Sequence, residues 1–213
     1  PFLRDLASGK DEMNLVEMPI FLLSSRAPDG VPVLRYRLED FDPKLKQVVE
    51  RKLTVIGDAE HGLPTSAAEK VYLALMHHAR AYNNFSDPLV YFCRAEVLKT
   101  LKWPNKKESY ERLTLAMNQL AGVRLKCVNY WRDNRAKQYH RVRENIGVLD
   151  EFKFRDSRKK GEGDFRAYLS EFRWGATMFE SFQASYIKTL DLSIAMSLKP
   201  LALRLEQLTF IHS

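Results

Sequence analysis

Cysteine is scarce in this chain: Cys93 and Cys127 are the only two among 213 residues. Two cysteines cannot build a disulfide framework or a zinc site. Cys127 alternates with Val123 and Leu125 on one face of an expected strand, which is typical of a buried thiol in a cytosolic protein. We therefore expect a reduced, cytoplasmic protein.

Long apolar runs are also missing. No stretch approaches the roughly 18 residues that a membrane-spanning helix needs. The apolar run 18–23 is too short for a signal peptide, and polar residues and a proline follow it. No membrane partner is expected. The chain opens with Pro1 and not with an initiator methionine, so we expect it to be a piece of a longer protein.

Signatures of catalysis are missing as well. No glycine-rich loop carries the Lys-Ser or Lys-Thr pair of a nucleotide hydrolase, and no close pair of carboxylates lies among apolar residues as an acid–base dyad would need. His77 and His78 are adjacent on an expected helix and point about 100° apart, so they cannot share a metal ion well. His140 and His212 are isolated. We expect no enzyme activity, no metal and no cofactor.

Positive charge is abundant, and it is concentrated in one stretch. The whole chain has a formal net charge of +7, whereas the segment 99–143 alone carries +9, from twelve Lys and Arg against three acids. The other residues therefore sum to −2. A local basic excess of this kind favours a polyanionic partner, and double-stranded DNA best suits the elements expected there.

Within the basic stretch, the apolar spacing predicts two helices joined by a short turn. The first covers 94–101 and ends before Trp103-Pro104, because a residue that precedes proline avoids the α conformation. Asn105 is expected to cap the second helix, with Glu108 at the capping-box position, and Gly122 to end it as a residue tolerant of positive φ. Apolar residues at a 3, 4, 3 spacing form the buried face of that helix: Tyr110, Leu113, Met117 and Leu120.

A hairpin is expected directly after the two helices. Strands 123–131 and 137–148 should pair around the polar, positive tip 132–136. A helix–turn–helix followed by a hairpin is typical of a winged-helix domain, whose second helix enters the major groove of DNA. Leu115 lies on the outer face of that helix, where it could contact a thymine methyl or pack under an N-terminal hairpin.

The expected DNA contacts form two groups. Polar groups on the outward face of the second helix can contact base edges: Lys106, Lys107, Ser109, Arg112 and Gln119. Cations on the hairpin would contact phosphates, which position a protein but do not specify a sequence: Lys126, Arg132, Arg135 and Lys137. The alternative is a solvated helix whose charges only maintain solubility.

The rest of the chain predicts further helices and hairpins. A capping box of Ser66 and Glu69 should open a long helix after Pro64. The expected strands are 19–23 and 33–38, paired around the turn 27–30, then 53–56, 89–92 and 186–190, with a second hairpin from 152–154 and 165–174 around 155–163. The last helices are expected at 178–184 and 193–208.

Several segments resemble the plasmid replication initiator protein A family. They are DEMNLVEMPI at 11–20, GLPTS at 62–66, SFQASYIKTLDL at 181–192 and LKPLALRL at 198–205, so the similarity spans nearly the whole chain. The resemblance implies an initiator that binds repeated origin sequences on a plasmid through winged-helix domains. Such proteins help to open the origin and recruit a host initiator or helicase, without hydrolysing nucleotide, and many shift between dimer and monomer.

Together, these patterns predict an α+β fold with a winged helix-turn-helix domain and added β-hairpins. The expected organisation is an N-terminal extension at 1–10, the winged-helix domain at 11–174 and the start of a second winged-helix module at 175–213. After Leu205 the family would continue a basic, aromatic helix, but here the chain stops soon after, so the DNA contacts of that module cannot be assigned. A winged-helix transcriptional repressor is the alternative function, and a metal-dependent nicking enzyme is a more distant one.

Overall fold

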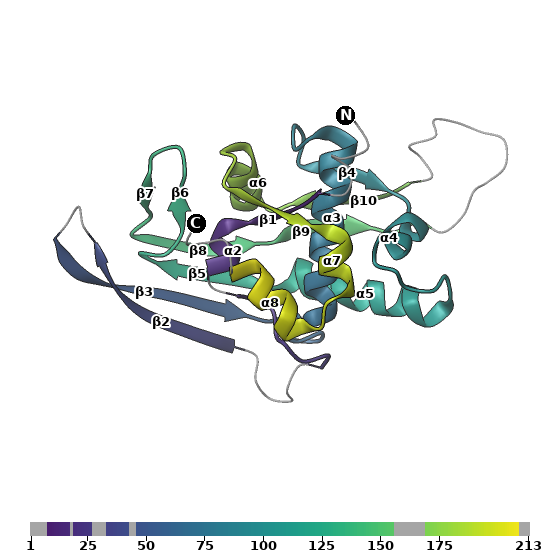
Figure 1. Cartoon of the computed structure of the whole chain (residues 1–213), viewed down its shortest axis with the longest axis horizontal. Helices are drawn as coiled ribbons and strands as arrows, with labels where there is room; N and C mark the ends of the chain where they lie inside the picture. The colour runs from purple at the N-terminus through teal and green to yellow at the C-terminus, as the bar shows by residue number, and fades with distance from the viewer. Residues whose placement is uncertain (1–7, 18, 27–32, 43–45, 156–168, 209–213) are drawn as a thin grey trace.

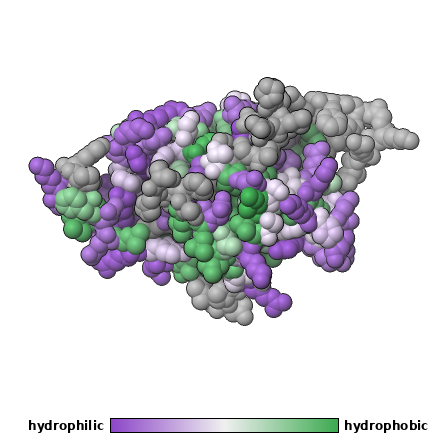
Figure 2. Space-filling model, viewed as in Figure 1, coloured by the Kyte–Doolittle hydropathy of each residue, from purple (hydrophilic) through white to green (hydrophobic). Residues whose placement is uncertain are grey.

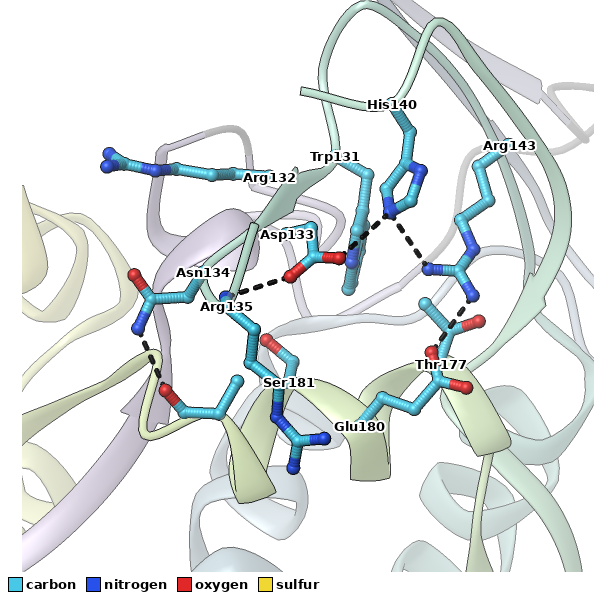
Figure 3. A pocket seen from close by; sticks show the side chains of 11 residues that line it. Trp131, Arg132, Asp133, Asn134, Arg135, His140, Arg143, Thr177, Glu180 and Ser181 are labelled. Carbon is cyan, nitrogen blue, oxygen red and sulfur yellow. Dashed lines mark hydrogen bonds and ion pairs between the residues drawn. The ribbon is translucent and has the colours of Figure 1, made fainter. Parts of the chain in front are cut away.

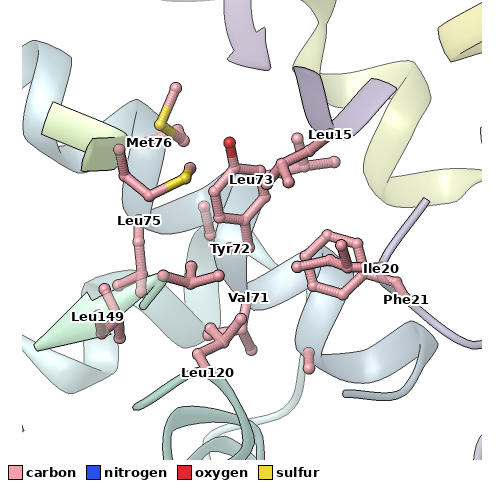
Figure 4. Close-up of a cluster of buried hydrophobic side chains, with 14 of the residues drawn as sticks. Leu15, Ile20, Phe21, Val71, Tyr72, Leu73, Leu75, Met76, Leu120 and Leu149 are labelled. Carbon is pink, nitrogen blue, oxygen red and sulfur yellow. The ribbon is translucent and has the colours of Figure 1, made fainter. Parts of the chain in front are cut away.

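The computed structural model describes residues 8–17, 19–26, 33–42, 46–155 and 169–208. It is a mixed α+β fold whose antiparallel sheets and shorter helices surround one long helix, α3 (Ser66–Asn83) (Figure 1). The side chains from Val71 to Met76 are completely buried. Figure 4 shows several of them against Ile20, Phe21 and Leu120. A helix that is buried on all sides is the centre of the hydrophobic core.

Four antiparallel strands form the larger sheet, in the order β2-β3-β5-β8. They are β2 (Val33–Asp42), β3 (Gln47–Ile56), β5 (Arg124–Val128) and β8 (Val142–Gly147). The predicted hairpin β5–β8 is confirmed, and its outer end carries the short pair β6 (Arg132–Asp133) and β7 (Gln138–Tyr139).

The predicted pairing of 33–38 with 19–23 is wrong. β2 pairs with β3 along ten residues, from Val33 opposite Ile56 to Asp42 opposite Gln47. The segment 19–26 is not a strand, because its apolar side chains enter the core beside α3. The turn expected at 27–30 lies outside the described residues.

Three further strands form a second sheet, in the order β4-β10-β9. They are β4 (Leu89–Phe92), β9 (Leu149–Lys153) and β10 (Ser170–Trp174). The expected second hairpin is therefore present as β9–β10, while most of its tip, 156–168, lies outside the described residues. The chain crosses from one sheet to the other at Val148, where Gly175 packs so closely that a Cβ atom would lie 2.0 Å from the carbonyl oxygen of Gly147.

The two basic-region helices are α4 (Arg94–Thr100) and α5 (Lys107–Gly122). Both predicted helices are confirmed, but the predicted capping box is wrong. Lys106 occupies the N-cap of α5, and the Asn105 side chain accepts a hydrogen bond from the Tyr110 hydroxyl instead, at 2.8 Å. Gly122 has no positive φ; its small size lets Asp58 approach, since a Cβ there would lie 2.5 Å from that of Asp58.

The predicted capping box of α3 is also wrong. Thr65 occupies the N-cap and makes no side-chain capping bond, and Ser66 is the first helical residue. The carboxylate of Glu69 turns away from the helix start, because it pairs with Arg204 at 2.7 Å.

A segment near the start of the chain pairs with a late one in a small sheet of β1 (Ser8–Glu12) and β11 (Ile187–Asp191). The helix α2 (Met13–Glu17) follows β1, and α6 (Ala176–Gln183) precedes β11. The helix predicted at 193–208 is broken into α7 (Leu192–Ser197) and α8 (Pro200–Leu208). Pro200 explains the break, because the residue before a proline avoids the α conformation.

The described part of the segment 175–208 shares the core of the rest of the chain. Met178, Phe182 and Leu203 are buried in the cluster that surrounds α3. The helix α8 buries Arg204 and Gln207 together with Leu203, and it exposes three leucines, Leu201, Leu205 and Leu208. Figure 2 shows an apolar surface where α8 lies in Figure 1.

Candidate nucleic-acid interface

The helices α4 and α5 pack as a helix–turn–helix. The apolar faces of both helices are buried, as the apolar spacing predicts. The buried residues are Val97 and Leu98 on α4, Leu101 directly after it, and Leu113 and Met117 on α5. The turn between the helices is fixed by its backbone, since the Trp103 amide donates to the Leu98 carbonyl at 2.9 Å and Pro104 follows. The start of α5 is thereby held at the surface of the domain.

The exposed face of α5 lies in its first half. The exposed residues are Lys107, Glu108, Glu111, Arg112 and Leu115, and no residue of α5 after Leu115 is exposed. Two of the predicted cations have acidic neighbours: Lys106 lies 3.7 Å from Glu108, and Lys107 lies 3.7 Å from Glu111. Exposed pairs of this kind contribute little to stability and exchange readily for other partners.

Arg112 differs from these lysines. Its guanidinium lies over the Trp103 ring, 4.2 Å from the ring centroid. Partial burial lowers the pKa of Arg112 from its ordinary value. The residue is exposed, and no ion pair joins its guanidinium to a carboxylate of the described residues. The contact between Arg112 and Trp103 could not be predicted from the apolar spacing, because in the sequence Trp103-Pro104 indicates only the end of a helix.

Ser109 and Gln119 do not lie on the outward face of α5, so that part of the prediction is wrong. Ser109 is 6% exposed and Gln119 is 2% exposed. The side chain of Gln119 donates to the His61 carbonyl at 3.0 Å and accepts from the Thr65 amide at 3.3 Å. The loop before α3 packs over this part of α5, which the local sequence of the helix cannot show.

Leu115 is exposed, at 45% of its surface. The interpretation that it packs under an N-terminal hairpin is therefore wrong, since no described hairpin covers it. Leu115 lies three and four residues after Arg112 and Glu111 on the same stripe of the helix. An apolar side chain in that place suits contact with a thymine methyl group.

The hairpin cations lie elsewhere. Figure 1 shows β6 and β7 toward one end of the long axis, and α4 with the start of α5 toward the other. Lys126 is exposed on β5 and lies 3.9 Å from Glu144, while Arg132 lies over the Tyr186 ring at 5.5 Å. The two predicted groups of DNA contacts are thus not adjacent on one surface.

A polar pocket of about 220 Å³ lies between the hairpin tip and α6 (Figure 3). Arg143 pairs with Glu180 at 2.9 Å, and Arg135 is exposed at the rim without an ion pair to the described residues. Asp133 accepts from the Arg135 and Ala136 amides, and the latter bond is the main cause that lowers the pKa of Asp133. The tip is therefore a hydrogen-bonded turn on which Arg135 is exposed.

The β9–β10 hairpin, by contrast, lies beside the two helices. Arg94, the first residue of α4, lies 5.0 Å from the Tyr110 ring centroid and 4.8 Å from that of Phe154, the residue after β9. Arg155 follows and lies 3.6 Å from Glu171 on β10. One arginine thus connects α4, α5 and this hairpin.

Other kinds of site have little support in the described residues. There, no group of three or more His, Cys, Asp or Glu could hold a metal ion. His78 is held next to Thr100 at 3.2 Å, and burial lowers its pKa to about 4. Within the same ranges, no helix has both the length and the apolar character to cross a bilayer.

Comparison with known protein families assigns the chain to one of them. The family model described as replication initiator protein A matches residues 10–209. The chain therefore belongs to the replication initiator protein A family. No curated protein sequence matches it.

Two solved structures resemble the fold. A crystal structure of domain 2 and domain 3 of RctB superposes with a TM-score of 0.60 at 9% identity, and the match covers 92% of this chain and 68% of that one. A second structure of RctB domains 2-3 gives a TM-score of 0.49 at 10% identity, covering 87% of this chain and 64% of that one. At this identity the first match supports the fold alone.

Proposed function

We propose that this chain is the DNA-binding part of a plasmid replication initiator, and that it binds the repeated sequences of an origin through a winged helix. The helix α5 enters the major groove, and binding promotes origin opening and recruits a host initiator or helicase, without nucleotide hydrolysis. Membership of the replication initiator protein A family supports initiation as the process. The geometry of α4 and α5 supports DNA as the ligand.

One observation carries the proposal. Arg112 lies on the exposed half of α5, is stacked on Trp103 and has no carboxylate partner among the described residues. An outward arginine on a surface helix can bind O6 and N7 of guanine with two hydrogen bonds. Arg112 is thus the base-reading residue of the proposal, and Lys106 and Lys107 contact nearby phosphates.

The sheet order supports a winged helix in which the wing is the β9–β10 hairpin and not the β5–β8 hairpin that the sequence predicts. A winged-helix domain has three helices, and the strand between the first and the second of them pairs with the hairpin that follows the third, the recognition helix. In this chain those helices would be α3, α4 and α5, and the strand would be β4. Because β4 pairs with β10, the hairpin β9–β10 corresponds to the wing. Arg94 contacts both this hairpin, through Phe154, and α5, through Tyr110. The β5–β8 hairpin belongs to the other sheet and is an added element.

The hairpin cations stay part of the proposal as a separate group. Lys126, Arg132, Arg135 and Lys137 provide sequence-independent phosphate contacts, away from α5. Ser109 and Gln119 are not proposed as contacts, because they are buried. Contacts made by a second winged-helix module, and a monomer–dimer equilibrium, stay predictions.

Binding of the chain to duplex origin repeats tests the proposal, with a scrambled duplex as competitor. We expect Arg112→Ala to lower the affinity for the repeats about 10-fold to 100-fold. The affinity of the variant for scrambled DNA should stay close to that of the wild type. Arg35→Ala removes one exposed arginine from β2 and serves as the matched control. Equal, sequence-independent losses in both variants would contradict the assignment of α5.

Replication of a plasmid that carries the origin separates an initiator from a transcriptional repressor, since both need the same groove contacts. An initiator requires Arg112 for plasmid maintenance as well as for DNA binding. If the protein is a repressor instead, Arg112→Ala would abolish DNA binding and raise transcription from the repressed promoter, but the plasmid would still be maintained.

A further inference from the structure

We propose that Trp103 is a positioning residue that fixes the orientation of Arg112 before DNA is bound. The proposal rests on the function proposed above and adds a specificity-determining residue that does not touch the DNA bases. Its basis is the stack of the guanidinium on the indole, with 4.2 Å between the guanidinium carbon and the ring centroid.

The indole is a fixed platform. Trp103 is half-buried and packs against the hydrophobic core, at the turn between α4 and α5. Its amide is bonded to Leu98, and Pro104 restricts the backbone after it. Arg112 reaches back from the second turn of α5 to cover the ring. The position of the guanidinium is therefore set by two elements together, not by the α5 backbone alone.

Stacking suits the chemistry of base reading. A guanidinium over an aromatic ring is held by the cation–π attraction, which needs no carboxylate and leaves N–H groups of the guanidinium for other partners. Two parallel hydrogen bonds to one guanine need such N–H groups. A long side chain that is restricted before binding loses less freedom when the complex forms.

The neighbouring cations show the contrast. Lys106 and Lys107 lie next to Glu108 and Glu111, so DNA has to replace these contacts. Arg112 has an aromatic partner instead, and DNA binding does not have to break it. A purely structural role for Trp103, which packs the turn, would affect folding but would leave the choice of base unchanged.

The free protein offers a direct test of the stack. Trp131 and Trp174 are 2% and 1% exposed, so Trp103 is the tryptophan that acrylamide reaches most easily. We expect Arg112→Ala to increase acrylamide quenching of the wild-type fluorescence, and to have no effect on quenching in a Trp103→Phe background. Quenching that is unchanged by Arg112→Ala would show that the stack is absent in solution and would overturn the proposal.

The role in specificity is tested by a double-mutant cycle. The guanine concerned is the one whose replacement by adenine weakens binding of the wild type but not of Arg112→Ala. Discrimination is the ratio of the affinity for the origin repeat to the affinity for the same repeat with adenine at that position. We expect Trp103→Leu to reduce this ratio about 10-fold, Trp103→Phe to restore most of it, and Trp103→Leu to have no further effect in an Arg112→Ala background. Circular dichroism and the thermal midpoint confirm that each variant is folded at the assay temperature.

The outcomes separate the two proposals. If Arg112→Ala reduces discrimination but a folded Trp103→Leu variant retains it, only the positioning role is overturned. If the two substitutions reduce discrimination additively, Trp103 acts independently of Arg112, and the positioning role is again overturned. If Arg112→Ala leaves discrimination intact, the base-reading role of α5 fails and the positioning role fails with it.

Discussion

The carboxylate of Glu69 and the guanidinium of Arg204 form a buried ion pair, with 2.7 Å between nitrogen and oxygen. Glu69 lies in the first turn of α3, and Arg204 lies 135 positions later on α8. Burial raises the pKa of Glu69, and the charge of Arg204 opposes that shift. A buried charge without its partner is costly, so the pair fixes which face of α8 turns inward.

Arg204→Ala is therefore expected to lower the free energy of unfolding by about 3–5 kcal/mol, because it leaves Glu69 buried without a partner. Replacing both residues, as Glu69→Leu with Arg204→Met, should cost much less. Urea denaturation measures both. Arg173→Ala is the control, since its pair with Glu151 is exposed and should contribute less than about 1 kcal/mol. Similar losses in the single and double variants would contradict the role of the pair.

Glu12 predicts an unusual pH dependence of stability. It is fully buried, and burial raises its pKa to about 7 although Ser181, Asn14 and the Leu15 amide donate hydrogen bonds to it. The folded state thus holds this proton more tightly than the unfolded state does. The contribution of Glu12 is most favourable below the unfolded pKa, near 4.5, and is lost as the pH rises through about 7.

Glu12→Gln is expected to remove this loss. The stability difference between the two proteins should shift in favour of the variant by about 3 kcal/mol as the pH rises from 4.5 to 8. Denaturation curves of both proteins at several pH values measure it, and all other titrating groups cancel in the difference. A difference that stays constant with pH would contradict the assignment to Glu12.

Periodic and local features of the fold could be predicted from the sequence. The 3, 4, 3 apolar spacing placed α5 correctly, and the alternation around Cys127 placed β5 in the core. The basic tip of the β5–β8 hairpin was also predicted, because a polar turn between two alternating segments has a clear pattern.

The errors arise where distant segments meet. The outward placement of Gln119 failed because the loop at His61 and Thr65 covers it. Glu69 has the spacing of a capping residue, but Arg204 is a stronger partner for a buried carboxylate. The break before α8 differs from these, because Pro200 is visible in the sequence and should have divided the predicted helix.

Salt dependence tests the electrostatic part of DNA binding. If about six phosphates are contacted, the affinity should fall about 10³-fold between 50 and 200 mM salt. Arg135→Ala at the hairpin tip should weaken all sequences alike and lower the slope of log affinity against log salt by about one. Fluorescence anisotropy at several salt concentrations measures both. A flat titration would rule out phosphate contacts, and an unchanged slope in the variant would remove the hairpin tip from the interface.

The exposed leucines of α8 predict self-association. Leu201 is 60% exposed beside Leu205 and Leu208, and an exposed apolar stripe usually marks an interface. Sedimentation velocity should show a dimer that increases with concentration, and Leu201→Asp should abolish it. Leu115→Asp places the same change on α5 and should leave association unchanged. A chain that stays monomeric whatever stands at 201 would rule the dimer out.

Photo-cross-linking from α5 to bound DNA tests the central claim most directly. A photoreactive residue in place of Leu115, which is 45% exposed, lies on the exposed stripe of α5 beside Arg112. One in place of Leu38, which is 52% exposed, lies on β2. With the origin repeat at saturating concentration, the account predicts cross-links from position 115 to bases within the repeat and none above background from position 38. Efficient cross-linking from position 38, with none from position 115 in the same DNA-bound protein, would contradict it.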